Sequence, residues 1–156
     1  MPYIKSEQRP LLLSGTVRAA SPGEANYLLT KSLHTIIGIH GLNYTNTFLV
    51  NLAIDVVKTL LNKPVVSQEE VDKLAADKSL GKVYHDVLYQ LILQINNLLH
   101  LHDTSLDEEG LYFIALLNDV QREFNRVVVA PYEDQKRKEN GSVSELDKVL
   151  NDKRAH

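Results

Sequence analysis

The chain has 156 residues, a net charge of −3 and no cysteine. A domain of this length buries about 70% of its extended surface. The charge gives no basic field of the kind that drives duplex DNA binding, and the lack of cysteine excludes disulfides, a thiolate nucleophile and cysteine-bound zinc. The start, MPYIKSEQRP, has no apolar signal-peptide core, and no later stretch has the apolar length of a membrane span. We expect a cytoplasmic protein that binds neither a membrane nor duplex DNA.

Three capping-box patterns predict helix starts. They span 21–24, 67–70 and 105–108, and in each a serine precedes a glutamate by three positions. The serine oxygen can accept a hydrogen bond from a first-turn N–H, and the glutamate can reach back to the serine N–H. Pro22 stands at the first helical position, where its missing N–H costs nothing. Each box heads an apolar run of helical period, and no segment alternates with period two over a useful length, so the chain is expected to be all-α.

The first helical hairpin is expected over 22–62. Its first helix carries the apolar stripe Ala25, Leu28, Leu29, Leu33, Ile36 and Ile37. After a break at 38–41, its second helix carries Phe48, Leu49, Leu52, Val56, Leu60 and Leu61. Pro64 ends this helix, because proline has no N–H to continue the ladder.

A short bridging helix is expected over 67–78 and a second hairpin over 80–130. The stripe of its first helix is Leu80, Tyr84, Val87, Leu88, Leu91, Ile92, Ile95 and Leu99. The stripe of its second helix is Leu106, Leu111, Ile114, Leu117, Val120 and Phe124. Four main helices with short connections pack best as an antiparallel bundle, so the prediction is a single domain over 1–156 made of two helical hairpins.

The two ends of the chain are expected to lie outside the four main helices. Residues 1–20 form an N-terminal segment whose Leu11 to Leu13 pack on the bundle or on a neighbouring molecule. Val127 to Val129 form the last turn of the long helix, and Pro131 is predicted to end it at Ala130. Residues 131–156 are then a polar C-terminal arm, with a short final helix capped by Ser144.

Polar side chains interrupt the apolar stripes. Asn51 and Asn118 are expected to fix the register of neighbouring helices or to line a polar pocket, because a buried amide must find hydrogen-bond partners. Six tyrosines lie mostly at stripe edges, where one or two are candidates for stacking on a ligand: Tyr27, Tyr44, Tyr84, Tyr89, Tyr112 and Tyr132.

Two His-Asp pairs, His85-Asp86 and His102-Asp103, offer an alternative with metal chemistry. Imidazole beside carboxylate suits a transition metal, and such pairs invite comparison with HD-domain phosphohydrolases. A histidine at a helix end also commonly bonds a terminal carbonyl, which is the structural role expected for His102. We expect no metal cofactor; the alternative is a Mg²⁺ or Mn²⁺ site at these four residues.

The segment HDVLYQLILQINNLLHLHDTSLDEE, 85–109, resembles one helix of the MazG-like all-α nucleotide pyrophosphohydrolases. In that group an E-x-x-D pair on this helix and an E-x-x-E pair on a preceding helix hold magnesium. The resemblance gives Asp86 the place of the aspartate, whereas the partner position holds Val83 and the preceding helix offers only Asp55. This departure implies that any such ancestral activity is lost.

Four short blocks resemble a family of small uncharacterised proteins of bacteria and their phages. They are MPYIKSEQR, PGEANYLLT at 22–30, HGLNYTN at 40–46 and EFNRVVVAPYEDQKRKENG at 123–141. The blocks cover under a third of the chain. The family tends to carry aromatic-Arg-Arg before the valines, where this chain has Asn125, Arg126 and Val127, and this puts a basic role of the motif in doubt. The resemblance implies a phage or mobile-element context and no particular reaction.

The family motifs indicate the candidate binding residues. One group lies on the first turns of the first helix and the other around the expected helix end: Glu24, Asn26, Tyr27, Arg126, Tyr132, Glu133 and Asp134. In an antiparallel bundle these ends can meet, where a carboxylate and an arginine would form a buried network that fastens the tail or, alternatively, a ligand site.

The expected function is non-catalytic. We expect a helical binding or adaptor protein that forms a homo-oligomer and binds a protein partner or sequesters a small nucleotide-like ligand. The alternative is a divalent-metal-dependent nucleotide phosphohydrolase of the MazG-like or HD-like kind.

Overall fold

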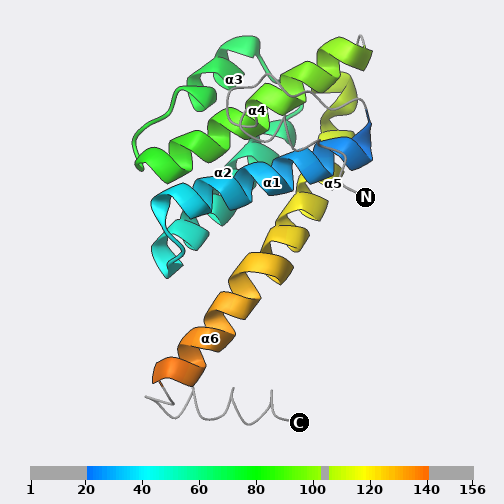
Figure 1. The fold of residues 1–156 in the computed structure, drawn as a ribbon. Helices are drawn as coiled ribbons and strands as arrows, with labels where there is room; N and C mark the ends of the chain where they lie inside the picture. The colour runs from blue at the N-terminus through cyan, green and yellow to red at the C-terminus, as the bar shows by residue number, and fades with distance from the viewer. Residues whose placement is uncertain (1–20, 103–105, 141–156) are drawn as a thin grey trace.

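The structure, a computed structural model, describes residues 21–102 and 106–140 (Figure 1). Every regular element within these ranges is helical, which confirms the predicted all-α fold. The elements are α1 (Pro22–His40), α2 (Tyr44–Leu61), α3 (Gln68–Ala75), α4 (Lys82–His102), α5 (Leu106–Phe124), the π-helical turn η2 (Asn125–Val129) and α6 (Ala130–Asn140). None of these helices is long and apolar enough to cross a membrane.

The four main helices form a bundle in which the two hairpins interlock. Helices α4 and α5 each pack on both α1 and α2, whereas α1 and α2 touch one another only slightly (Figure 1). The core therefore lies between the hairpins, with α3 added against α4. Its largest fully buried side chains come from both hairpins: Leu28, Leu29, Leu33, Ile36, Ile54, Leu88, Leu91, Leu98, Phe113, Leu117 and Phe124.

Helix α1 follows its predicted pattern closely. Ser21 is the N-cap, and its Oγ accepts a hydrogen bond of 3.2 Å from the Glu24 N–H. All six apolar side chains of the predicted stripe are buried. The helix continues through Gly38, however, and ends only at His40, where Gly41 adopts a φ of 108° that suits glycine. The second predicted box is complete at Ser67 and Glu70, while Ser105 of the third lies outside the described residues.

The buried face of α2 differs from the prediction. The buried side chains are Thr47, Val50, Ala53, Ile54, Val57 and Leu61, whereas Phe48 is 53% exposed. Helix α2 has apolar residues on several sides, so periodicity alone does not select the face that meets α1, α4 and α5. The prediction that Leu111 of α5 lies in the core is likewise wrong, because its side chain is 82% exposed.

The expected helix end at Ala130 is also wrong. The chain stays helical through Pro131 to Asn140 by means of the π-helical turn η2. There the Ala130 N–H donates to the Asn125 carbonyl, five residues back instead of four. In a regular α-helix the ring of Pro131 would clash with the carbonyl of Val127, and the wider turn relieves this contact.

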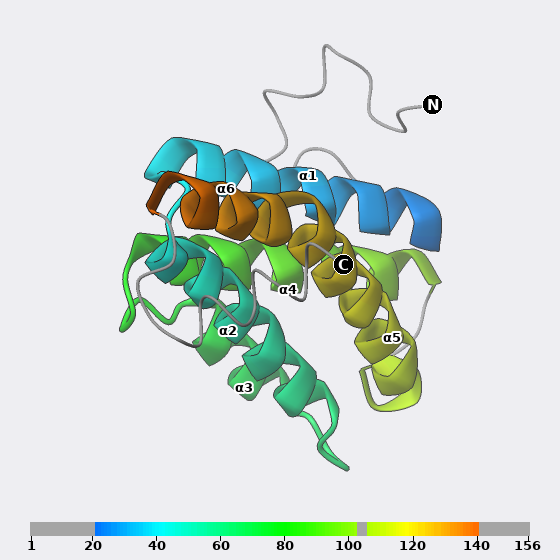
Figure 2. The same cartoon turned by 90° about the horizontal axis from the view of Figure 1, so that it is seen from below.

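Helix α6 leaves the bundle as a projecting rod (Figures 1 and 2). Helix α6 packs mainly against η2, the turn that precedes it. Seen from below in Figure 2, α6 passes in front of the bundle on the side of α1 and α2. The predictions for 1–20, for Asp103 and for a final helix from Ser144 concern residues outside the described ranges.

Candidate functional site

A cleft of about 530 Å³ lies between the first turns of α1 and the middle of α5. Its walls are Pro22, Gly23, Asn26 and Tyr27 from α1 and Tyr112, Ala115, Leu116 and Asp119 from α5. Small-molecule sites in proteins have volumes of roughly 300–1,000 Å³ and apolar walls with few polar groups. The cleft has this size and composition.

Helical spacing explains why these side chains share the cleft. On α5 the lining residues follow one another at intervals of three, one and three positions, which places them on one face. On α1 the Ser21 cap fixes where the helix starts and so sets the direction of Asn26 and Tyr27. Gly23 has no side chain and Ala115 has only a methyl group, so the walls stay apart.

The cleft presents two aromatic side chains, Tyr27 and Tyr112, beside the polar groups of Asn26 and Asp119. Burial raises the pKa of the Tyr112 phenol, and the charge of Glu109 adds to this shift, so Tyr112 stays a neutral donor at physiological pH. The Tyr112 ring packs edge-on against Phe113 with centroids 5.2 Å apart. Tyr27 carries the Lys31 ammonium 5.5 Å from its ring centroid.

The carboxylate of Asp119 stands at the edge of the cleft. Its side chain is 60% exposed, and its Oδ1 lies 3.3 Å from Nη1 of Arg122 on the same helix. An exposed pair of this kind is weak, so the carboxylate can also accept from a ligand. Asn26, from the opposite wall, adds an amide that both donates and accepts.

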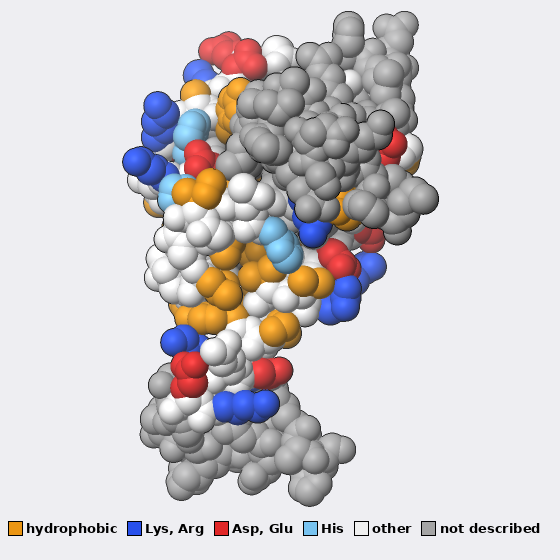
Figure 3. All heavy atoms as spheres, viewed as in Figure 1, with side chains coloured by type: hydrophobic (Ala, Val, Ile, Leu, Met, Phe, Trp, Pro, Cys, Tyr) orange, Lys and Arg blue, Asp and Glu red, His pale blue; other side chains and the backbone are white. Residues whose placement is uncertain are grey.

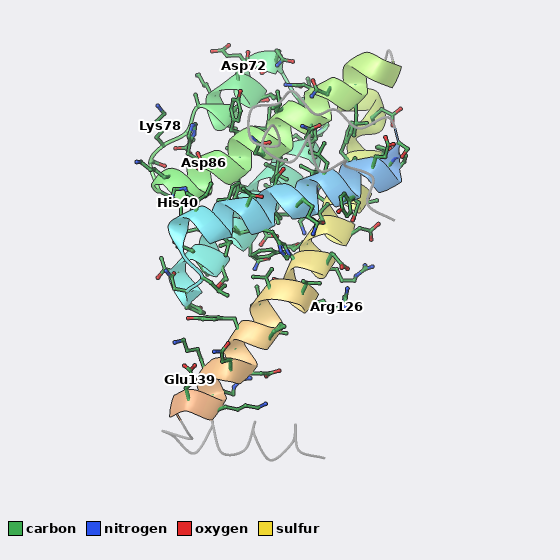
Figure 4. All side chains as sticks on the ribbon, in the orientation of Figure 1. His40, Asp72, Lys78, Asp86, Arg126 and Glu139 are labelled. Carbon is green, nitrogen blue, oxygen red and sulfur yellow. The ribbon has the colours of Figure 1, made fainter. Side chains whose placement is uncertain are left out.

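A second polar site joins the end of α1 to the start of α4 (Figure 4). His40 Nε2 and Asp86 Oδ2 lie 3.1 Å apart, and their side chains are 22% and 42% exposed. The neighbouring His85 turns elsewhere: its Nδ1 lies 3.1 Å from the carbonyl oxygen of Asp77. A hollow of about 270 Å³ lies beside the pair and is lined by His85, Asp86, Tyr89 and Gln90.

The alternative metal site is only partly within the described structure. His85 and Asp86 use different partners, and the side chains of His102 and Asp103 lie outside the described residues. Within the part of the chain that the structure describes, no three histidine, aspartate or glutamate side chains converge as metal ligands would.

The acids expected from the MazG-like resemblance do not assemble either. Val83, at the position of the second acid, is a core side chain only 6% exposed. Asp55 faces α5, where it accepts a hydrogen bond of 3.0 Å from Gln121. Among the described residues, Asp86 therefore stands without the acids that the resemblance requires beside it.

The predicted binding residues fall into two separate places. Asn26 and Tyr27 line the α1–α5 cleft, and Glu24 lies in the first turn of α1 beside it. The second group lies away from the cleft, with Arg126 on η2 and the other three residues on α6 (Figures 1 and 4). Arg126 is 69% exposed and pairs with Glu123 at 2.6 Å, so it does not form the expected buried network. Of the others, Asp134 pairs with Arg137 at 3.3 Å, Tyr132 carries Lys136 near its ring, and Glu133 is half-buried.

A ladder of polar side chains fixes the register of α2 against α5. Asn51 donates to Asn125 at 2.9 Å and accepts from Gln121 at 3.1 Å. Further along, the ammonium of Lys58 reaches Asn118 at 3.0 Å, Gln121 at 2.7 Å and Asp55 at 3.3 Å. The three N–H groups of the Lys58 ammonium thus meet three acceptor oxygens. The contacts of Asn51 and Asn118 agree with fixing the register, and Asn118 also lines a polar hollow of about 470 Å³ together with Asp55 and Lys58.

Comparison of the chain with protein-family models, with curated proteins and with solved structures found no match. The function of the cleft is therefore inferred from the residues that line it and from their geometry.

Most of the α5 wall was not predicted from the sequence. Tyr112 was expected only as one of several stripe-edge tyrosines, and nothing in the local pattern joins Asp119 to Asn26 and Tyr27. The available signal was the i, i+7 spacing of Tyr112 and Asp119 around the small Ala115, which indicates a polar-edged, recessed face on one helix.

Proposed function

We propose that the protein is a non-catalytic binding protein that holds a small planar ligand carrying an amino group, such as the base of a nucleoside, in the α1–α5 cleft. The observation that supports this function is the combination of Tyr27 and Tyr112 with Asn26 and Asp119 around one cleft of about 530 Å³.

Each part of the cleft matches a part of such a ligand. Aromatic side chains stack on nucleobases with about 1–3 kcal/mol per base. The Asp119 carboxylate accepts hydrogen bonds and so favours an exocyclic amino group over a carbonyl oxygen at the same place. It also repels a phosphate, so the cleft suits the base end of a nucleotide-like ligand.

The decisive experiment compares nucleosides that differ in one amino group. Adenosine is expected to bind more tightly than inosine, which lacks the exocyclic amine, in isothermal titration calorimetry. Tyr27→Ala is expected to weaken adenosine binding roughly tenfold, as loss of one stacking partner does. Asp119→Asn is expected to remove most of the preference for adenosine over inosine.

Tyr89→Ala is the matched control, because Tyr89 is 43% exposed and lies outside the cleft. It is expected to bind like the unmodified chain. The proposal is wrong if no amino-bearing nucleoside binds, or if Tyr27→Ala and Tyr89→Ala have the same affinity.

The second candidate function is a divalent-metal-dependent nucleotide phosphohydrolase at Asp86. It is favoured by the contact between His40 and Asp86 beside the hollow of about 270 Å³. Magnesium in proteins is held mainly by carboxylates and substrate phosphates, and Asp86 is the one carboxylate among the described residues that line this hollow. Phosphate release from nucleotides with Mg²⁺ or Mn²⁺ that is abolished by Asp86→Asn would establish this function in place of the binding function.

A further inference from the structure

The register set by the polar ladder between α2 and α5 also indicates which residues of the two helices face one another beyond Asn51 and Asn125. Asn51 meets Asn125, and each step toward the start of α2 is matched by a step toward the end of α5 and η2. One turn before Asn51 stands Phe48, and one turn after Asn125 stand Val128 and Val129. The polar seam between these helices therefore becomes apolar at this end.

Val128 and Val129 still pack against the bundle core, and the two sides of the seam separate beyond them. Helix α6 diverges from the bundle (Figure 1), and Tyr44 and Phe48 of α2 are left 67% and 53% exposed. Their rings stack on one another with centroids 6.3 Å apart, so they present one continuous aromatic surface. Ile39, in the last turn of α1, and Leu42, in the loop before α2, are 64% and 46% exposed.

We name this surface the α2–α6 seam and define it by Ile39, Leu42, Tyr44 and Phe48 on one side and Val128, Val129 and Tyr132 on the other. Figure 3 shows hydrophobic side chains gathered where α6 leaves the bundle. A continuous apolar patch of several large side chains marks an interaction site more often than an ordinary surface.

The charges of α6 indicate which partner fits. Its first half carries Glu133 and Asp134, and its second half carries Lys136, Arg137 and Lys138 with one acid, Glu139, so the two halves have net charges of opposite sign. An antiparallel copy of the same helix places each acidic half against a basic half. This complementarity of the helix with itself favours a second copy of the chain, because a two-fold interface joins the same surface of both copies.

We propose that the α2–α6 seam is the interface of a homodimer in which the two α6 helices lie antiparallel across a two-fold axis. Each copy contributes two exposed aromatic side chains, and aromatic side chains bury roughly 150–250 Å² each when fully covered.

The first test removes the apolar surface. Sedimentation velocity over a dilution series is expected to show a dimer for the unmodified chain. The double variant Tyr44→Asp, Phe48→Asp is expected to raise the dimer dissociation constant by more than about a hundredfold, as loss of central aromatic contacts does. Both positions are exposed, so the variant is expected to keep its helical circular dichroism spectrum.

The matched control is Val65→Asp, Leu111→Asp. These side chains are 73% and 82% exposed and lie outside the seam, so the control is expected to dimerise like the unmodified chain. A monomer at every concentration overturns the proposal, and so does an equal effect of the two double variants.

The second test separates a copy of the chain from a different protein partner. Glu133→Lys, Asp134→Lys makes both halves of α6 net basic, with Glu139 as its one remaining acid, and is expected to yield monomers. Adding Arg137→Glu and Lys138→Glu reverses the sign of the net charge of each half of α6. The ion pair between positions 134 and 137 is kept with its charges reversed, so dimerisation is expected to return. Failure of the fourfold variant to dimerise contradicts the antiparallel arrangement.

The third test uses the absence of cysteine from the chain. Gln135 lies at the middle of α6, so an antiparallel pair brings the two Gln135 positions together. Gln135→Cys is expected to form a disulfide-linked dimer on mild oxidation, because a disulfide needs Cα atoms within about 7 Å. Leu111→Cys is expected to stay monomeric on a denaturing gel, and equal cross-linking of both variants contradicts the proposal.

Discussion

Asn51 of α2 donates a hydrogen bond of 2.9 Å to Asn125 of η2, 74 positions later in the chain. The same Asn51 accepts a bond of 3.1 Å from Gln121. One amide thus ties the first hairpin to the last turn of the bundle, at the point where α5 changes from α-helical to π-helical geometry. The sequence indicates Asn51 by its polar character within an apolar stripe, but only the structure shows that its hydrogen-bond partners are Asn125 and Gln121.

Asn51→Ala is expected to destabilise the fold by about 1–2 kcal/mol. The substitution removes one donor and one acceptor and leaves the Asn125 oxygen without this partner in a half-buried place. The urea midpoint measures the loss. Thr35→Ala is the control, since its exposed hydroxyl bonds only the Lys31 carbonyl of its own helix. Equal midpoints for the two variants would contradict a role for Asn51 in joining the hairpins.

Pro131→Ala is expected to stabilise the chain by about 1 kcal/mol. Proline has no N–H to donate within the helix and its ring crowds the carbonyl of Val127, whereas alanine can restore a regular α-helical turn. Helical ellipticity and the thermal midpoint should both rise slightly. Pro64→Ala is the control, because Pro64 lies between helices α2 and α3. An unchanged or lower midpoint for Pro131→Ala would indicate that Pro131 is not the cause of the π-helical geometry of η2.

The contrast between α1 and α2 explains how far the fold could be predicted. In α1 the apolar residues form one stripe, so the sequence alone identified all six buried apolar side chains. In α2 they occupy several sides, and the buried face depends on where α4 and α5 pack. Pro131 was misinterpreted for a related reason: proline normally ends a helix, and only the wider turn of η2 allows this one to continue.

The candidate site depends still more on tertiary packing. Asn26 and Tyr27 were marked from the sequence, but the α5 wall of their cleft lies far along the chain. His40 and Asp86, 46 positions apart, meet only because α1 ends where α4 begins. Local patterns predict which residues share a helix face, and they carry no information about which two faces pack together.

The stability of the protein is expected to fall when His34 takes up a proton. Burial lowers the pKa of His34, the positive charge of Lys31 lowers it further, and the negative charge of Glu123 opposes this shift in part. The unfolded chain therefore binds the proton at a higher pH than the folded chain does. The contribution of His34 is fully present above the unfolded pKa of about 6.5 and is lost as the pH falls toward the folded pKa.

The test compares urea midpoints of the unmodified chain and His34→Gln at a pH above this window and a pH within it. His34→Gln removes this titration, so its midpoint is expected to fall less on acidification than that of the unmodified chain. Parallel losses in the two proteins would show that the proton uptake of His34 does not differ between the folded and unfolded states.

The contact between His40 and Asp86 is expected to couple the turn after α1 to the start of α4. The turn is built to present His40: Gly41 adopts its positive φ, and the Asn46 amide donates to the carbonyls of His40 at 3.3 Å and Gly41 at 2.8 Å. A double-mutant cycle of His40→Asn and Asp86→Asn separates the pairwise contact from other effects of each change. Because both side chains are partly exposed, we expect a coupling energy of about 0.5–1 kcal/mol.

This coupling distinguishes a structural contact from a catalytic one. If the pair only fastens α1 to α4, each single variant lowers the urea midpoint and the double variant is less destabilised than the sum of the two. A cycle with no coupling in stability would contradict a structural role for the contact between His40 and Asp86, and would leave the metal-dependent alternative as the remaining role for this hollow.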